Sequence, residues 1–242
     1  MKFVALATDY DGTLAEDGRV RPEVLDALRR LKKSGRKLVL VTGRELDELM
    51  GVFPEITVFD KVVAENGALL YSPTPPTERA LATPPPPAFA ASLQLRGVTP
   101  ISCGRVIVAT WQPHEATVLA VIQEQGLELE VIFNKGAVMV LPSGVNKASG
   151  LVAALGDLGI DRAHVVGVGD AENDHSLLGA CGLGVAVSNA VPALKQRAEL
   201  VTNGARGDGI IELCERLMTN DCADVAPRRT PSLVPSAPAI ER

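Results

Sequence analysis

Short apolar runs alternate with helical patterns near the start of the chain. Phe3 to Thr8 and Lys37 to Val41 are apolar and rich in β-branched residues, as is typical of buried strands. Pro22 to Lys33 has leucines at helical spacing, and Pro22 suits the first turn of a helix. Gly35 suits the C-terminal cap, and a second helix is predicted over Glu45 to Val52. This order of strands and helices predicts a parallel sheet.

The same rhythm returns after about Lys147. The predicted elements are a helix to Leu158, a strand His164 to Val168, a helix through Leu177 and Leu178, a strand Gly184 to Val187, a helix Val191 to Arg197, a short strand at Leu200, and a helix Gly209 to Met218. The two ends of the chain are therefore predicted to form one α/β domain with a Rossmann-like, doubly wound parallel sheet.

Prolines interrupt the pattern between these two parts. Pro73, Pro75, Pro76 and the run Pro84 to Pro87 supply too few N–H donors for a central strand, which predicts a boundary. The segments beyond it read αββαββ, a small inserted α+β domain: helix Ala88 to Arg96, strands Thr99 to Ser102 and Arg105 to Trp111 turning at Gly104, helix Pro113 to Gln125, and strands Leu129 to Phe133 and Ala137 to Leu141 turning at Asn134 to Gly136.

These patterns predict four parts of the chain. Residues 1–82 and 143–220 form the large domain, residues 83–142 form the insertion, and residues 221–242 form a tail. The tail interleaves prolines with Ala, Ser and Arg, a composition that favours an extended chain. We expect a disordered tail or a linker there.

Composition narrows the possible partners. The 242 residues are 46% hydrophobic and 22% charged, as in ordinary globular proteins. The net charge of -5 argues against nucleic acid or an anionic membrane as a partner. No apolar run reaches the roughly 18 residues of a membrane span, so a soluble, cytoplasmic protein is expected. The four cysteines have no CxxC spacing and are expected to be buried thiols rather than zinc ligands or disulfides.

Two carboxylates follow the first strand directly. Asp9 and Asp11 lie two residues apart in DYDGT, so they flank one small site at the carboxyl edge of the sheet. Neighbouring carboxylates repel unless a cation or a proton relieves them, which suggests Mg²⁺ and one protonated group. The alternative is that both residues only cap a turn and a helix.

Three further motifs fall at strand ends or helix starts. Thr42-Gly43-Arg44 places a hydroxyl and backbone N–H groups at a helix N-terminus, although Thr42 alone is also a plain N-cap. Asp170 and Asp174 in GDAEND bring a second acidic pair to the same edge, and hard oxygen ligands favour Mg²⁺ over zinc. Lys147 begins a helix and can hold a phosphate, whereas any single lysine is more often simply exposed.

DYDGT, TGR, Lys147 and GDAEND, in this order and at these places, resemble the motifs of the haloacid dehalogenase (HAD)-like phosphohydrolases. The resemblance covers roughly residues 1–218. The αββαββ insertion is similar to a short cap of the Cof-type (type IIB) subgroup. The stretch Ala64 to Ala68 looks most like archaeal-type phosphoglycolate phosphatases and sucrose-phosphate phosphatases.

The resemblance implies catalytic and metal-binding roles. Asp9 is expected to attack phosphorus and form an aspartyl-phosphate, and Asp11 to protonate the leaving alcohol and then activate water. Mg²⁺ is expected on the Asp9 carboxylate, the Asp11 carbonyl and Asp170, with Asp174 a ligand directly or through water.

The resemblance also implies which groups contact the substrate. Thr42, Lys147 and the Gly43 N–H are expected to bind the phosphoryl oxygens, and Asn173 to orient the phosphoryl group or its loop. Specificity is expected in cap residues at the two hairpin turns, namely Arg105, Asn134 and Lys135. Trp111 is expected to be a buried anchor of the cap sheet rather than a substrate platform.

The predicted function is Mg²⁺-dependent hydrolysis of a small phosphorylated metabolite, either a sugar phosphate or phosphoglycolate. Two alternatives stay open. One is a phosphomutase of phosphosugars, which would require a bisphosphorylated sugar and release phosphate slowly. The other is a catalytic or regulatory module of a longer polypeptide, which the linker-like tail suggests.

Overall fold

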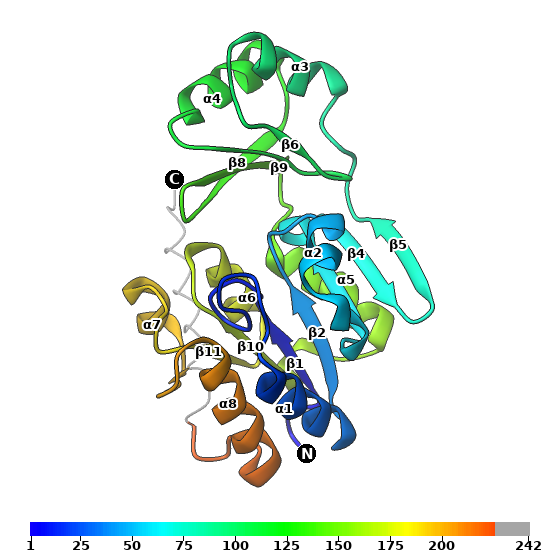
Figure 1. Cartoon of the computed structure of the whole chain (residues 1–242), viewed down its shortest axis with the longest axis vertical. Helices are drawn as coiled ribbons and strands as arrows, with labels where there is room; N and C mark the ends of the chain where they lie inside the picture. Colours follow the sequence, from blue (N-terminus) through cyan, green and yellow to red (C-terminus); the bar gives the residue numbers. More distant parts are fainter. Residues whose placement is uncertain (226–242) are drawn as a thin grey trace, which may run out of the picture.

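The computed structural model describes residues 1–225, which form two sheets (Figure 1). The larger has the order β12-β11-β10-β1-β2-β3-β4-β5 and belongs to the core domain. Its strands are β1 (Ala5–Thr8), β2 (Lys37–Val41), β3 (Lys61–Ala64), β4 (Leu69–Pro73), β5 (Pro76–Ala80), β10 (Val165–Gly169), β11 (Leu183–Ala186) and β12 (Leu200–Val201). Pairing is parallel from β12 to β3 and antiparallel from β3 to β5.

Helices cover both faces of this sheet (Figure 1). They are α1 (Pro22–Lys33), α2 (Leu46–Val52), α5 (Lys147–Leu158), α6 (His175–Ala180), α7 (Pro192–Arg197) and α8 (Arg206–Asn220), with short 3₁₀ helices η1 (Pro54–Val58), η2 (Glu65–Gly67), η3 (Arg162–His164) and η4 (Glu172–Asp174). Helices α1 and α8 pack together, as do α5 and α6. The doubly wound α/β core predicted from the sequence is confirmed.

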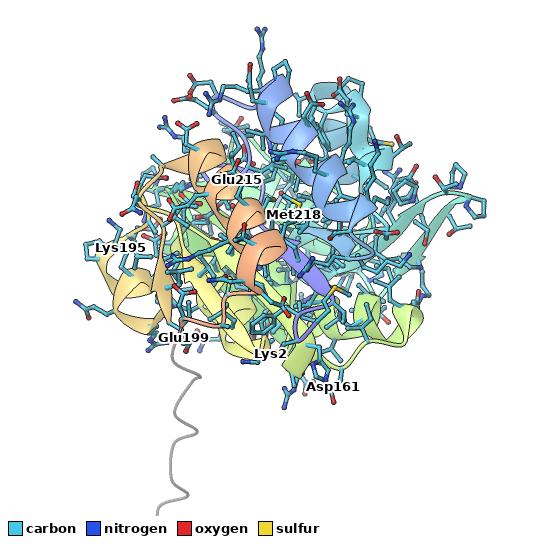
Figure 2. All side chains as sticks on the ribbon, turned by 90° about the horizontal axis from the view of Figure 1, so that it is seen from below. Lys2, Asp161, Lys195, Glu199, Glu215 and Met218 are labelled. Atoms are coloured by element: carbon cyan, nitrogen blue, oxygen red, sulfur yellow. The ribbon has the colours of Figure 1, made fainter. Side chains whose placement is uncertain are left out.

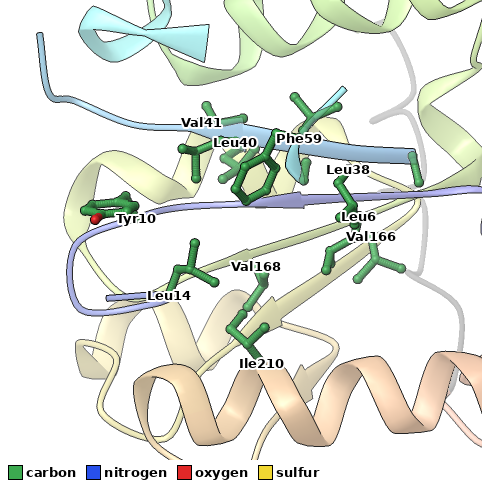
Figure 3. Close-up of a cluster of buried hydrophobic side chains, with 14 of the residues drawn as sticks. Leu6, Tyr10, Leu14, Leu38, Leu40, Val41, Phe59, Val166, Val168 and Ile210 are labelled. Atoms are coloured by element: carbon green, nitrogen blue, oxygen red, sulfur yellow. The ribbon is translucent and has the colours of Figure 1, made fainter. Parts of the chain in front are cut away.

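The core is apolar because its central strands are covered on both faces. Every residue of β1, β10 and β11 is buried. Leu6 and Val166 from neighbouring strands meet Leu38 of β2 and Ile210 of α8 in one cluster (Figure 3). Tyr10, just after β1, extends this cluster toward the edge where the site lies, and its ring packs against Phe53.

Strands β3, β4 and β5 are not among the elements predicted from the sequence. The prolines that indicated a boundary lie where a hairpin tolerates them: Pro73 and Pro76 face each other at the end of β4 and the start of β5. Strand β5 is exposed throughout and forms the edge of the sheet, so its missing N–H donors leave no buried partner unpaired.

The insertion forms a separate cap over one end of the core (Figure 1). Its elements are α3 (Pro87–Leu95), β6 (Ser102–Cys103), β7 (Val108–Trp111), α4 (Glu115–Glu124), β8 (Leu129–Asn134) and β9 (Ala137–Pro142), the predicted αββαββ order. The sheet order is β6-β7-β9-β8. Phe89 and Leu93 of α3 and Val118 of α4 pack on one face of this sheet, and the other face is turned toward the core.

The folded chain continues a few residues past the predicted core. Asp221 accepts hydrogen bonds from the backbone of Lys2 and Phe3, and Cys222 is buried. The rest of the predicted tail lies outside the described residues. The end of the core farthest from the cap carries charged surface side chains, among them Lys2, Lys195 and Glu215 (Figure 2). None of the helices in residues 1–225 has the length and apolar character needed to cross a membrane.

Candidate active site

The predicted acidic residues meet at the carboxyl edge of the core sheet. Strand β1 pairs with β10 in parallel register, with Thr8 opposite Val168, so Asp9 and Asp170 leave the sheet side by side. Asp174 follows in η4 and its carboxylate turns back to the same point. Ligand oxygens of Asp9, Asp170 and Asp174 lie within 4.8 Å of one another, and all three residues are buried.

Lys147 joins two of these carboxylates. Its Nζ donates to Oδ1 of Asp9 and to Oδ1 of Asp174, each at 2.6 Å, and its side chain is only 1% exposed. Lys147 is the first residue of α5, whose start is fixed by a capping box between Asn146 and Ser149. Burial alone would lower the pKa of Lys147, but the carboxylates of Asp174 and Asp9 outweigh burial and raise this pKa. The lysine is therefore a fixed cation.

One ammonium does not balance the negative charge at this edge. The pKa of Asp9 is raised to about 8, mainly by burial and further by repulsion from Asp174 and Asp170, although Lys147 lowers it. Asp174 already uses its Oδ2 to accept from the backbone N–H groups of Asp170 and Ala171, at 2.9 and 3.0 Å. A second cation bound among these oxygens would stabilise the ionised form of Asp9.

A cation from the cap reaches two of the predicted ligand atoms. Lys135, in the turn between β8 and β9, donates through Nζ to the Asp11 carbonyl at 2.9 Å and to Asp170 Oδ2 at 2.8 Å. A Cβ at Gly12 would lie 2.4 Å from Asp170 Oδ2 and 2.8 Å from Lys135 Nζ, so only glycine leaves this space open. The space beside Gly12 thus accepts a positive charge. The oxygens around it, from a carbonyl and carboxylates, are ligands of the kind that Mg²⁺ prefers.

The Asp11 side chain faces a different partner. Arg44 binds it with two hydrogen bonds, from Nε at 2.6 Å and from Nη2 at 2.7 Å, and also pairs with Glu48. This bidentate contact fixes the Asp11 carboxylate at the edge of a cavity between core and cap. The Asp11 carbonyl instead shares the Lys135 ammonium with Asp170. No role for Arg44 is predicted from the sequence, because only the fold brings it opposite Asp11.

The predicted phosphate-binding residues lie around the same edge. Thr42 is buried after β2, and its hydroxyl oxygen accepts from the Arg44 N–H at 3.1 Å. Gly43 lines the cavity next to Met139 of the cap and to Asn173. Asn173 donates to Asn66 Oδ1 at 3.0 Å, and its own Oδ1 is buried with no hydrogen-bond partner among the described residues.

A cavity of about 410 Å³ opens above the acidic edge, between core and cap. Its core side is formed by Asp9, Asp11, Gly43, Arg44, Glu45 and Glu48, and its cap side includes Trp111, Asn134, Lys135 and Met139. Of the three cap residues expected to govern specificity, the structure brings Asn134 and Lys135 to the cavity and leaves Arg105 outside it, paired with Asp47 and Glu78.

Two expectations about side-chain burial were wrong. Trp111 is 53% exposed and lines the cavity, because it lies on the face of the cap sheet that no cap helix covers. Cys103 is exposed in β6, which is a short edge strand, whereas the other three cysteines are buried as expected.

Glu65 is a buried acid that the motif analysis passed over. Its Oε1 accepts from the Arg105 N–H at 2.7 Å, and its Oε2 from Val106 and Ile107 at 2.7 and 2.9 Å. A core residue thereby holds the backbone of the cap. The only sequence signal is an acidic residue, followed by Asn66 and Gly67, directly after an apolar stretch. In the structure Glu65 and Asn66 both have positive φ.

Enzymes that move a phosphoryl group onto a carboxylate use a carboxylate, fixed cations and a lid that excludes water. This site combines buried carboxylates, the ammonium of Lys147 and a cap over the core (Figure 1), which is the arrangement of that class of enzyme. The chain belongs to the haloacid dehalogenase-like hydrolases, whose sequence profile matches residues 6–81 and 115–213. The interval between the two matched segments holds the first half of the cap.

Relatives and solved structures agree with this assignment. The chain is 33% identical over 222 residues to a phosphoglycolate phosphatase of Methanothermobacter thermautotrophicus, covering 88% of this chain and 98% of the relative. It is 30% identical over 226 residues to one from Natronomonas pharaonis, covering 89% and 98%. A HAD-like hydrolase from Bacteroides thetaiotaomicron superposes with a TM-score of 0.74 at 20% identity, covering 89% of this chain and 99% of that structure.

A sugar phosphatase of HAD subclass IIB also superposes, with a TM-score of 0.70 at 20% identity, covering 88% and 98% of the two chains. The predicted resemblance to Cof-type phosphatases with a type IIB cap is confirmed, and the chain is a phosphatase of this family.

Proposed function

We propose that this protein hydrolyses a small phosphorylated metabolite in the cytoplasm, with Mg²⁺, through an aspartyl-phosphate formed on Asp9. The contact of buried Lys147 with Asp9 and Asp174 carries the proposal, because it fixes a cation beside an acid that faces the cavity. The names of the relatives support two candidate substrates, phosphoglycolate and a sugar phosphate.

The charges at the sheet edge suit the two halves of this reaction. Mg²⁺ would supply positive charge against the phosphoryl oxygens. It would be held by Asp9, the Asp11 carbonyl and Asp170, with Asp174 a ligand directly or through water. Lys147 neutralises Asp9 and the incoming phosphoryl group from the other side. The Thr42 hydroxyl and the Gly43 N–H lie next to this point at the end of β2 and would bind the phosphoryl oxygens. Asn173, which is tied to Asn66, would hold the loop that carries Asp174.

Two displacements then complete the hydrolysis. In the first, a carboxylate oxygen of Asp9 bonds to phosphorus while the bond from phosphorus to the leaving oxygen breaks, and Asp11 gives that oxygen a proton. In the second, water attacks phosphorus and loses its proton to Asp11, and phosphate leaves Asp9. Arg44 holds the Asp11 carboxylate beside the cavity through both of its oxygens, and one of these two hydrogen bonds has to open for Asp11 to carry the proton. The cap limits the entry of other water.

The test is phosphate release from a panel of phosphate esters, with Mg²⁺ or with EDTA. We expect release by the wild type only with Mg²⁺, and a loss of at least about a thousandfold in Asp9→Asn, which is nearly isosteric but has no anionic nucleophile. Asp26→Asn, an exposed aspartate on α1, is the matched control and should behave as wild type.

Trapping the intermediate tests the mechanism itself. Substrate labelled in the phosphoryl group, quenched in acid within one turnover, should leave label on the protein that hydroxylamine removes. Label on Asp9→Asn, or undiminished release in EDTA, would contradict the proposal. Label without net phosphate release would favour the phosphomutase alternative, to be tested with bisphosphorylated sugars.

A further inference from the structure

The cap presents an apolar wall to the catalytic edge. Trp111 faces the cavity from β7, and Ile107, Ala109, Ala137 and Met139 line the same side. Trp111 pairs with Ala137, and side chains at paired positions of a sheet share a face, so the indole and its neighbours form one surface. A half-exposed tryptophan here leaves a large apolar area in contact with whatever fills the cavity.

The size of the cavity exceeds what the smaller candidate substrate needs. At about 410 Å³ it lies within the range of about 300–1,000 Å³ typical of pockets that enclose drug-sized ligands. The leaving group of phosphoglycolate has only two carbons. Bound at Asp9, it would leave the Trp111 wall bare.

The charge of the cavity also disfavours a second anion on the substrate. Glu45 and Glu48 form its outer core wall, and burial together with repulsion from Glu65, Glu48 and Asp47 raises the pKa of Glu45. Arg44, one of the cations that line the cavity, is engaged by Asp11 and Glu48, whereas Lys135 holds Asp170 only as long as no metal ion takes its place. Within residues 1–225 no other Lys or Arg lines the cavity, so a glycolate carboxylate would meet at most Lys135, against the carboxylates of Glu45 and Glu48.

Resting on the function proposed above, we propose that the leaving group is a sugar whose ring packs against Trp111. A sugar ring combines an apolar C–H face with hydroxyl donors, and the cavity offers an aromatic face opposite two carboxylate acceptors. The same carboxylates favour hydroxyl donors and repel an acid, so Trp111, Glu45 and Glu48 determine specificity together.

Trp111 reports on this contact directly, because it is the single tryptophan of the chain. In Asp9→Asn, which binds esters without turning them over, glucose 6-phosphate or ribose 5-phosphate should change the intrinsic fluorescence in a saturable way. Phosphoglycolate at the same phosphate-site occupancy, measured by calorimetry, should change it far less. Equal changes with the acid and the sugars would overturn the proposal.

Kinetics on matched variants provide the second test. Trp111→Ala should raise the KM for the better sugar phosphate about tenfold and lower the preference for it over phosphoglycolate, while Trp111→Phe keeps most of that preference. Phe133→Ala is the control: Phe133 is also an exposed aromatic of the cap sheet, but it pairs with Val138 and so shares the helix-covered face. It should leave both substrates unaffected.

The outcomes separate this proposal from the general function. Absence of phosphate release from every ester would refute the phosphatase proposal itself. A different result would be a higher kcat/KM for phosphoglycolate than for any sugar phosphate, with this preference unaltered in Trp111→Ala and lost in Lys135→Met. It would show that Lys135 binds the carboxylate of the substrate. That result would refute the sugar as leaving group and would leave the phosphatase proposal intact.

Discussion

At the scale of single residues, the catalytic edge is a set of fixed charges to which the cap adds one movable cation. Lys147 is enclosed and held by two carboxylates, whereas Lys135 is 46% exposed and reaches Asp170 from a turn. The Asp11 carbonyl and Asp170 that hold Lys135 are also predicted Mg²⁺ ligands. An ammonium and a metal ion cannot occupy the same few ångströms, so Mg²⁺ bound at the predicted ligands would compete with Lys135.

Removing Lys135 should therefore tighten metal binding. In Lys135→Met we expect Mg²⁺ to bind about two- to fivefold more tightly, since a partly exposed ion pair contributes at most about 1 kcal/mol. Isothermal titration of Mg²⁺ measures this without substrate. Arg105→Gln, which removes a cap cation that does not reach the cavity, controls for the general loss of positive charge. Equal affinities in wild type and Lys135→Met would contradict the competition.

The residues that could be predicted are those whose place follows from a strand end. Asp9, Asp170 and Lys147 come directly after a strand or begin a helix, so local pattern alone sends them to one edge. Arg44 and Glu65 could not be assigned in this way. Their partners are more than thirty residues away in the sequence, and the contacts depend on how the cap and the β1 loop pack.

At the scale of elements, η2 joins the core to the cap. Glu65 reaches across because Gly104 has no side chain: a Cβ there would lie 2.5 Å from Glu65 Oε1. Three backbone N–H groups of the cap then share one buried carboxylate. This contact ties the cap backbone from Arg105 to Ile107 to the core.

Glu65→Gln should loosen this connection. The amide keeps one acceptor oxygen, but its NH₂ group would face a backbone N–H, so one end of the contact becomes repulsive. Hydrogen bonds to charged groups contribute about 1.5–3 kcal/mol, and we expect a loss of about 2 kcal/mol in unfolding free energy. Hydrogen exchange at the amides of Arg105, Val106 and Ile107 should accelerate. Glu78→Gln, which breaks only an exposed pair with Arg105, should leave those amides protected.

Elements with a clear period were predictable and elements built by context were not. Helix α1 and strand β2 have the predicted bounds, because an amphipathic helix and a fully apolar strand are strong local signals. The β4–β5 hairpin was missed because its prolines lie at a turn and on an edge strand. Nothing in the local sequence shows that a strand with prolines will lie at the edge of the sheet. The exposure of Trp111 depends on which face of the cap sheet the helices cover, and alternation alone does not decide that.

At the scale of the whole molecule, the first and last described segments are held together on the side of the core away from the cap. Asp221, just after α8, accepts from the backbone of Lys2 and Phe3 before β1 and pairs with Arg36 before β2 at 3.0 Å. Arg36 is buried and also donates to the Phe3 and Leu217 carbonyls. One carboxylate thus ties both ends of the fold to the start of the strands that carry the proposed catalytic residues at their other end.

This tie makes stability depend on acidity in a defined direction. Burial would raise the pKa of Asp221, but the hydrogen bonds from Lys2, Arg36 and Phe3 outweigh burial and lower it below its usual value of 3.8. A carboxyl whose pKa is lower in the folded state stabilises the fold above its unfolded pKa, and that stability is lost as the pH falls through the folded value. The contribution is complete near neutral pH.

Asp221→Asn should accordingly lower the unfolding free energy at pH 7 by about 1–2 kcal/mol, because it removes the charge but keeps the shape. Urea denaturation of wild type and variant from pH 7 down to pH 2 should show the gap between them closing only below about pH 4. Asp26→Asn is the matched control, since that exposed carboxylate on α1 pairs with Arg29 of the same helix and takes no part in the contacts of Asp221. A gap that is independent of pH would mean that Asp221 acts through packing or geometry rather than through its charge.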